Sequence, residues 1–323
     1  MTHRSANIPR TDRYLEVRRE KTKNHQEPRP NGTLEKIVMG VSIIISTYNS
    51  TKWLEKVIWG YLGQSYTQFE LVVADDGSDQ ETADLVSRLR KQTGLTIRHV
   101  WHEDRGFRKC EILNKAIVES TGDYIILSDG DCIPHPDFVH THLRLAEPNY
   151  LLSGGCVRLS SVLSERISIE NIRKQQCTDL RWLRANGFPL SKDILKLLPA
   201  KQIAWLMNWL TPTRATLNGH NASLWKADVL KVNGFDQRME YGGLDRELGE
   251  RLFNSGIRCK QVRHQAVCVH LDHGRPYVRQ EVLQRNRAIR DYTLRSGSTW
   301  TPHGIDSNDE LRASSSNILS PAA

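Results

Sequence analysis

The stretch VSIIIS at residues 41–46 is a continuous run of apolar and β-branched residues. Such a run is typical of a strand that is buried on both faces of a parallel sheet. Three further runs have the same character: FELVVAD at 69–75, TIRHVW at 96–101 and DYIILSD at 123–129. The first 130 residues or so are therefore expected to contribute four strands to one sheet.

Helical patterns separate these strands. Apolar residues recur at helical spacing over 51–64, 82–90 and 110–119. Strands that alternate with helices through short links predict a parallel sheet with right-handed crossovers. We therefore expect an α/β protein with a Rossmann-like, mostly parallel sheet that helices flank on both sides.

Polar residues follow three of the strands, at the edge where their carboxyl ends meet. Ligands of open parallel sheets bind off this edge, so these residues are candidates for ligand binding. The alternative is ordinary turn chemistry, in which Ser78 or Asp79 caps the next helix and the other polar residues turn the chain. The segments are Thr47-Tyr48-Asn49, Asp75-Asp76-Gly77-Ser78 and Asp129-Gly130-Asp131.

Asp129 and Asp131 are separated by Gly130, which lets the backbone turn so that both carboxylates can converge. Mg²⁺ or Mn²⁺ typically takes one or two protein carboxylates and fills its other positions with water and phosphate oxygens. This pattern predicts a divalent cation site that would neutralise a diphosphate leaving group. An aspartate of the 75–78 segment could accept the N–H of a pyrimidine base.

Composition excludes several classes of protein. The chain has 323 residues, of which 38% are hydrophobic and 25% charged, so it is neither a disordered chain nor a small disulfide scaffold. No window holds the roughly 18 uninterrupted apolar residues of a membrane span. The six cysteines form no C-x-x-C pattern, and we read them as reduced thiols. We see no secretory signal and expect a cytoplasmic protein.

The net charge of +8 raises the question of an anionic partner. Residues 1–36 carry nine Lys or Arg against five Asp or Glu, which is half of the excess. This basic segment is predicted to be a disordered tail, with peripheral contact to the anionic inner face of a membrane as the sharper alternative. A nucleic-acid partner is not expected, because the candidate pocket is acidic.

The rest of the chain is predicted to be a single domain followed by a second disordered tail. The expected boundaries are 37–295 for the domain, 41–131 for its first half, 132–295 for its second half, about 160–215 for a helical insertion and 296–323 for the tail. Within the second half we expect helices at 167–184, 191–210, 226–232 and 244–253 and a strand at 266–271.

Four motifs carry a family resemblance. VSIIISTYNSTKWLEKVI, FELVVADDGSDQETADLV and TGDYIILSDGDCIPHPDF resemble the opening of family 2 glycosyltransferases with the GT-A nucleotide-sugar-binding fold. HNASLWKADVLKVNGFDQRMEYGGLDRELGERLF, at 220–253, resembles the galactosyltransferase-type second half of that fold. The resemblance runs from about Val41 to His273, with a gap over 160–215.

The resemblance implies roles in binding a UDP-sugar. Asp129 and Asp131 look like the DxD motif that holds Mn²⁺ or Mg²⁺ with the diphosphate. HEDRGFRKCEILNKAI at 102–117 is similar to the segment whose basic residues face the nucleotide, although a solvated loop explains its charges equally well. The residues implied for nucleotide-sugar binding are Thr47, Tyr48, Asn49, Asp75, Asp76, Arg105, Arg108, Asn114, Asp129 and Gly130.

The second half is implied to supply the base. Asp245 matches the family's aspartate that takes the proton from the acceptor hydroxyl, which is a poor nucleophile without a base. Leu244 stands where the family usually has Glu, and Glu247 could partly replace it. The alternative is that Asp245 and Glu247 only favour the start of a helix. Gly243, which precedes Leu244 and Asp245, is also expected to belong to the acceptor site.

Four more residues complete the implied site. Asn221 matches a position near the bound sugar, and Trp225 is either a core residue or an acceptor-stacking surface. One of His270 and His273 would complete the coordination of the metal, as a histidine after the last strand does in many GT-A enzymes.

Taken together, the resemblance implies an inverting, metal-dependent transferase. It would move a hexose or N-acetylhexosamine, galactose-type favoured, from a UDP-sugar to a hydroxyl of a surface glycan or a lipid-linked oligosaccharide. One alternative is a catalytically inactive carbohydrate- or nucleotide-binding relative. A sugar nucleotidyltransferase is disfavoured, because its first loop is Gly-rich and STYNSTKWLEK contains no glycine.

Overall fold

The computed structural model describes residues 40–198, 201–210, 215–274 and 278–307, all within one compact unit. The predicted tail at 1–36 lies outside the described residues. Within the described ranges, no helix combines the length and the apolar character that crossing a membrane requires.

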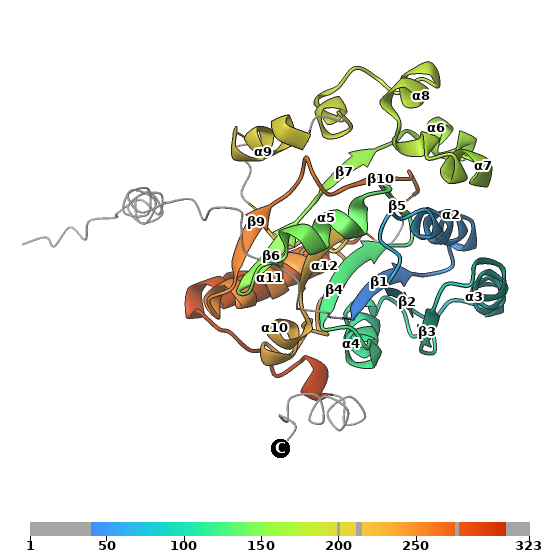
Figure 1. Cartoon of the computed structure of the whole chain (residues 1–323). Coiled ribbons are helices and arrows are strands. Elements are labelled where there is room, and N and C mark those ends of the chain that lie inside the picture. The colour runs from blue at the N-terminus through green and yellow to red at the C-terminus, as the bar shows by residue number, and fades with distance from the viewer. Residues whose placement is uncertain (1–39, 199–200, 211–214, 275–277, 308–323) are drawn as a thin grey trace, which may run out of the picture. The chain divides into compact units, whose positions relative to one another are not determined.

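A seven-stranded sheet forms the centre of the protein, in the order β3-β2-β1-β4-β8-β6-β9 (Figure 1). The pairs β1–β2, β2–β3 and β1–β4 are parallel, which confirms the mostly parallel sheet, while β8 runs antiparallel to β4 and β6. The strands are β1 Val41–Thr47, β2 Glu70–Asp75, β3 Ile97–Trp101, β4 Tyr124–Asp129, β6 Tyr150–Ser153, β8 Asn221–Trp225 and β9 Arg258–Gln261.

Strand register brings the predicted ligand-binding segments together. Thr47 pairs with Asp75, and Ser46 pairs with Asp129, so β1, β2 and β4 end side by side. The polar residues that follow these strands therefore gather at one edge of the sheet, as the sequence pattern predicts.

Helices cover both faces of the sheet, and β1 shows why. Ile43 and Ile45 pack in one core cluster with residues of α2 and α3, whereas Ile44 packs in a second cluster with residues of α4, α10 and α11. Side chains alternate between the faces of a strand, so an uninterrupted apolar run requires a helical layer on each side. Each fully buried isoleucine contributes about 1.5–3 kcal/mol to folding. The helices of these layers are α2 Thr51–Leu62, α3 Gln80–Thr93, α4 Lys109–Glu119, α5 Phe138–Leu145, α10 Lys226–Lys231 and α11 Leu244–Asn254.

A second, three-stranded sheet stands beside the first. Its strands are β5 Cys132–Pro134, β10 Val267–His270 and β7 Gly155–Arg158, with β10 in the middle. His270 pairs with Cys132 on one side and with Arg158 on the other. The strand expected at 266–271 is confirmed, and it returns the chain to the end of β4.

The helical insertion is more broken than expected. The single helix predicted at 167–184 is wrong, because Gln175 adopts a left-handed conformation (φ 59°) that ends the first helix, and Asp179 caps a new one. The helix predicted at 191–210 likewise divides into η2 and α9. The elements here are α6 Ser161–Arg166, α7 Ile169–Arg173, η1 Gln176–Thr178, α8 Leu180–Ala185, η2 Lys192–Lys196 and α9 Lys201–Leu210, in the upper part of Figure 1.

The end of the domain lies further along the chain than the sequence indicates. A long helix, α12 Gln280–Ser296, packs against α11 and was not predicted. The disordered tail expected from residue 296 is wrong for residues 297–307, which include η3 Ile305–Ser307. Ile305 is 1% exposed in the second core cluster, and Asn233 donates a hydrogen bond to the Thr301 carbonyl. Residues 308–323 lie outside the described residues.

Candidate active site

A cavity of about 1060 Å³ opens at the carboxyl edge of the large sheet. This volume suits a ligand larger than an ordinary drug-sized molecule. Its walls include the end of β1, the β4–β5 turn, the start of α11, the segment after β10 and one face of α12. The predicted residues that line it are Thr47, Tyr48, Asn49, Asp76, Asp129, Gly130, Asp131, Gly243, Asp245, His270 and His273.

Asp129 is held in the cavity by a lysine and a serine. Lys109 Nζ and Ser46 Oγ each donate to its Oδ1 atom at 2.7 Å. Burial by itself raises the pKa of Asp129, but the charge of Lys109 outweighs this and lowers the pKa well below its ordinary range. Burial also lowers the pKa of Lys109, and Asp129 more than reverses that shift. Both groups are therefore charged at neutral pH.

Asp131 is the centre of the candidate metal site. Its Oδ2 atom lies 2.7 Å from His273 Nε2 and 3.6 Å from His270 Nε2. The ligand atoms of Asp131, Cys132 and His270 all lie within 4.8 Å of one another. A carboxylate and an imidazole at this separation, with Asp129 two residues away, form a donor set that suits Mn²⁺ or Mg²⁺. The residues present therefore fit the predicted cation.

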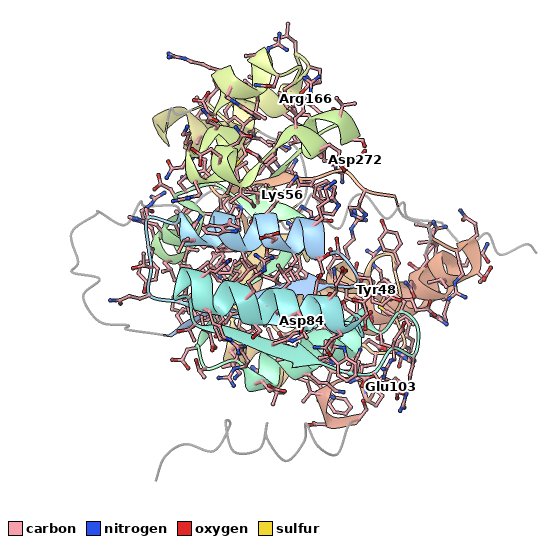
Figure 2. The ribbon with its side chains drawn as sticks, turned by 90° about the vertical axis from the view of Figure 1, so that its right-hand side faces the viewer. Tyr48, Lys56, Asp84, Glu103, Arg166 and Asp272 are labelled. Atoms are coloured by element: carbon pink, nitrogen blue, oxygen red, sulfur yellow. The ribbon has the colours of Figure 1, made fainter. Side chains whose placement is uncertain are left out.

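The end of β1 supplies the side of the cavity predicted to bind the nucleotide. Tyr48, labelled in Figure 2, is 51% exposed, and its hydroxyl donates to Asp104 Oδ2 at 2.9 Å. That hydrogen bond, more than burial, raises the pKa of Tyr48. Gly77 lets the Asp104 loop approach, because a Cβ atom at Gly77 would lie 2.6 Å from the Asp104 Cα atom.

The two aspartates that end β2 have different environments. Asp76 lines the cavity, where it accepts the backbone N–H of Arg108 at 3.0 Å and lies 2.8 Å from His102 Nε2. Asp75 is fully buried, and its carboxylate accepts the backbone N–H of Ser78 and contacts His99. Only Asp76 can contact a ligand in the cavity, so the assignment of Asp75 is corrected to a role in the turn after β2.

The three residues expected from the 102–117 segment do not line the cavity. The side chain of Arg105 is 70% exposed and pairs with Glu103. The Arg108 guanidinium bonds to Glu111 and to a backbone carbonyl. Asn114 is fully buried and exchanges two hydrogen bonds with the backbone of Phe235. The solvated-loop reading is therefore the better one for Arg105, and Asn114 ties α4 to the second half.

Asp245 lies at the start of α11, on the cavity wall. Its carboxylate is oriented by two backbone N–H groups, from Gly219 at 3.1 Å and from Arg246 at 2.9 Å. Leu244, which replaces the family's usual glutamate, is 7% exposed and packs in the second core cluster. The cavity thus holds one oriented carboxylate in addition to the candidate metal site.

Three residues assigned to acceptor binding lie elsewhere. Glu247 is 1% exposed and forms a buried ion pair with Arg251. Asn221 is fully buried, and its amide donates to the carbonyls of Gly155 and Ala266, so it joins the two sheets. Trp225 pairs with Tyr124 at the start of β4, the end opposite to Asp129. Each of the three is a structural residue, because neighbouring side chains and backbone groups already contact its polar or aromatic atoms.

Other lining residues escaped the sequence analysis. Lys109 lies at the start of α4 and points at Asp129, although a solvated loop explains the charges of this segment equally well. The remaining ones come from α2, β7, α11, α12 and the loops between elements, and three of them lie within the 220–253 motif without being candidates there. They include Trp53, Cys156, Arg158, His220, Tyr241, Arg246, Leu283, Arg287 and Arg290. Helical spacing of Leu283, Arg287 and Arg290 is the signal that could have found the last three.

Comparison with known proteins finds a family match in the first part of the chain. Residues 42–186, somewhat less than half of the chain, match the family model described as Glycosyl transferase family 2. The matched segment ends before β8 and therefore does not test the predicted galactosyltransferase-type second half.

Curated relatives are similar over most of this chain. The validoxylamine A glucosyltransferase of Streptomyces hygroscopicus subsp. jinggangensis is 29% identical over 67% of the chain and 52% of its own length. The chondroitin synthase of Escherichia coli is 26% identical over 70% of the chain and 34% of its own length. The chain therefore spans about half or less of the length of these relatives.

Solved structures confirm the GT-A fold. A mannosyltransferase from Pyrobaculum calidifontis, in complex with GDP-Man and Mn²⁺, superposes with a TM-score of 0.52 at 18% identity, over 96% of this chain and 84% of that one. Residues 1–349 of S. aureus TarS in complex with UDP-GlcNAc superpose with a TM-score of 0.53 at 17% identity, over 78% and 65% of the two chains.

Proposed function

We propose that this protein is an inverting, metal-dependent glycosyltransferase that uses a UDP-sugar. The observation that carries the proposal is that Asp129, Asp131 and two histidines line the same cavity as the oriented carboxylate of Asp245. A donor site and a base that share one cavity are what a displacement at a sugar carbon requires.

The reaction follows from these positions. Asp131, Asp129 and His270 or His273 would hold Mn²⁺ or Mg²⁺, which neutralises charge on the departing diphosphate. Asp245 takes the proton of an acceptor hydroxyl as its oxygen attacks the anomeric carbon of the donor. The new glycosidic bond forms as the bond to the diphosphate breaks, so a single displacement inverts the anomeric configuration. The Asp245 proton then passes to solvent.

The relatives support the donor and the cation. Solved complexes with a similar fold contain UDP-GlcNAc in one case and GDP-Man with Mn²⁺ in the other. The DDGS segment at residues 75–78 favours UDP as the nucleotide. The 220–253 motif favours galactose or its N-acetylamino analogue as the sugar. The acceptor is a glycan in cell-surface polysaccharide or lipid-linked oligosaccharide synthesis. Residues 1–36 give a basic segment for peripheral contact with the anionic inner face of a membrane.

Titration calorimetry tests the donor site. UDP, GDP, CDP and dTDP are titrated with and without Mn²⁺ into the intact protein, an Asp129→Asn/Asp131→Asn variant and an Asp84→Asn control on the exposed face of α3 (Figure 2). We expect UDP binding that requires Mn²⁺, that the double variant loses and that the control retains. If none of the four nucleotides binds in a metal-dependent way, the proposal is contradicted. If GDP binds more tightly than UDP, GDP replaces UDP as the donor nucleotide.

A further inference from the structure

Helix α12 is fastened to the loop that precedes Asp245. The amide of Asn286, which is 1% exposed, donates to the carbonyls of Glu240, Tyr241 and Gly242 at 3.0 to 3.2 Å. Gly242 has a φ of 109°, a conformation that favours glycine, and Leu283 Cδ2 lies 2.3 Å from where its Cβ atom would be. The helix is therefore a fixed part of the cavity wall.

One face of α12 lines the cavity. Leu283, Arg287 and Arg290 are spaced at i, i+4 and i+7, which places them on the same side of a helix. Arg290 forms an ion pair with Glu250. Together with Arg246, the residue after Asp245, this face makes the wall around the base cationic.

Two of these arginines have no partner among the described residues. In the described part of the chain, the guanidinium groups of Arg246 and Arg287 form no hydrogen bond or ion pair, although both residues line the cavity. By contrast, Arg279, which precedes α12, and Arg285, which lies on it, both pair with Glu240. The charges of Arg246 and Arg287 therefore lie where a ligand can reach them.

Their location assigns these charges to the acceptor. The donor diphosphate in the proposed function belongs with Asp129 and Asp131, at the ends of the parallel strands. Arg246 follows the proposed base on α11, and Arg287 comes from α12, the helix that Asn286 ties to the loop before the base. A guanidinium forms strong, often bidentate, hydrogen bonds with carboxylate, sulfate or phosphate.

We propose that Arg246 and Arg287 bind an anionic group of the acceptor, close to the hydroxyl that Asp245 deprotonates. The proposal rests on the proposed function and narrows its acceptor to an acidic glycan. The two cations offset the repulsion between such a glycan and the carboxylate of Asp245. A neutral acceptor leaves both cations without a partner and therefore reacts less efficiently.

The test measures UDP release from UDP-glucose, UDP-galactose, UDP-GlcNAc and UDP-GalNAc with oligosaccharides of matched length. The panel contains neutral, uronate-containing, sulfated and phosphorylated oligosaccharides. Comparing them identifies which anionic group of the acceptor the enzyme recognises. The enzymes compared are the intact protein, Arg246→Gln, Arg287→Gln, the double variant and Arg285→Gln. Arg285 is the matched control because it lies on α12, outside the cavity lining, and leaves Glu240 paired with Arg279.

We expect anionic glycans to stimulate release and each single variant to lower kcat/KM for them by about 10-fold or more, as the loss of a charge-assisted hydrogen bond predicts. The control should match the intact protein. Calorimetric Mn²⁺–UDP affinity should be unchanged in all variants.

Three results overturn the acceptor assignment: neutral glycans that react as well as anionic ones, a double variant that keeps full activity on anionic glycans, or no stimulation by any anionic glycan. Weaker UDP binding in the double variant instead reassigns these arginines to the donor. If the intact protein does not bind UDP in the presence of metal, the proposed function itself fails. The UDP-binding measurement therefore distinguishes failure of the proposed function from failure of the acceptor assignment.

Discussion

Replacing Glu247 with alanine removes one half of a buried ion pair on α11. Both side chains of the pair are 1% exposed, and the Glu247 carboxylate accepts three hydrogen bonds from Arg251 at 2.7 to 3.0 Å and one from Thr293. The same guanidinium donates to the carbonyls of Val232 and Gly234. The pair therefore joins α11 to α12 and to the loop after α10.

The expected loss of stability follows from the uncompensated charge. Removing one partner of a buried pair typically costs about 3–5 kcal/mol, because the remaining ion stays buried. For a unit of this size, at about 2 °C per kcal/mol, that corresponds to a decrease in Tm of roughly 6–10 °C. Urea unfolding followed by circular dichroism measures the free energy, and calorimetry measures Tm.

A second variant separates charge from packing. Glu247→Leu/Arg251→Met removes both ions and keeps apolar volume, so it should recover most of the loss. The reasoning is refuted if Glu247→Ala unfolds within about 1 kcal/mol of the intact protein and instead raises the KM for acceptor. That result would return Glu247 to the acceptor site.

Three further predictions concern the base, the loop and pH. Asp245→Asn should lower the rate of sugar transfer by about 10²-fold or more, as loss of a general base does, while calorimetric Mn²⁺–UDP binding persists; loss of UDP binding would contradict the role of base. Gly242→Ala should lower the free energy of unfolding by about 1–3 kcal/mol, since its φ of 109° disfavours a side chain; a variant as stable as the intact protein would contradict this assignment of strain. Burial lowers the pKa of His142 to about 4, and the hydrogen bond to Asn221 partly opposes this shift. As the pH falls below about 6.5, the unfolded chain therefore binds a proton at this residue before the folded protein does. Stability present at neutral pH should therefore decrease by about 2 kcal/mol between pH 7 and 5 through this group, and a His142→Gln variant with an unchanged pH slope would refute it.

The parallel half of the sheet could be predicted because its signals are local. The run from 41 to 46 must be buried on two sides, and period-2 alternation then places Ile44 on the face opposite to Ile43 and Ile45. Polar residues after such strands can only gather at one edge. Asp76, Asp129 and Asp131 were found in this way.

The errors fall on residues whose partners are distant in sequence. Asn114 and Asn221 match family positions, yet the side chain of each forms hydrogen bonds with backbone groups that are distant in sequence. The partner of Asn114 is Phe235, more than 100 residues away. The helix predicted at 167–184 fails at Gln175, where a left-handed residue that no local pattern marks divides it. Local patterns carry no information about which groups will meet after folding.

By itself the sequence determined the order of the strands along the chain and the polar residues at their carboxyl ends, because short-range periodicity and spacing specify them, whereas the family resemblance pointed to Asp245. Tertiary structure alone decided which polar groups remain free. Lys109 is directed at Asp129, Glu247 is buried with Arg251, and α12 brings Arg287 to the cavity. A charged side chain becomes structural or available to a ligand according to whether folding supplies it with a partner, and burial makes that difference energetically large.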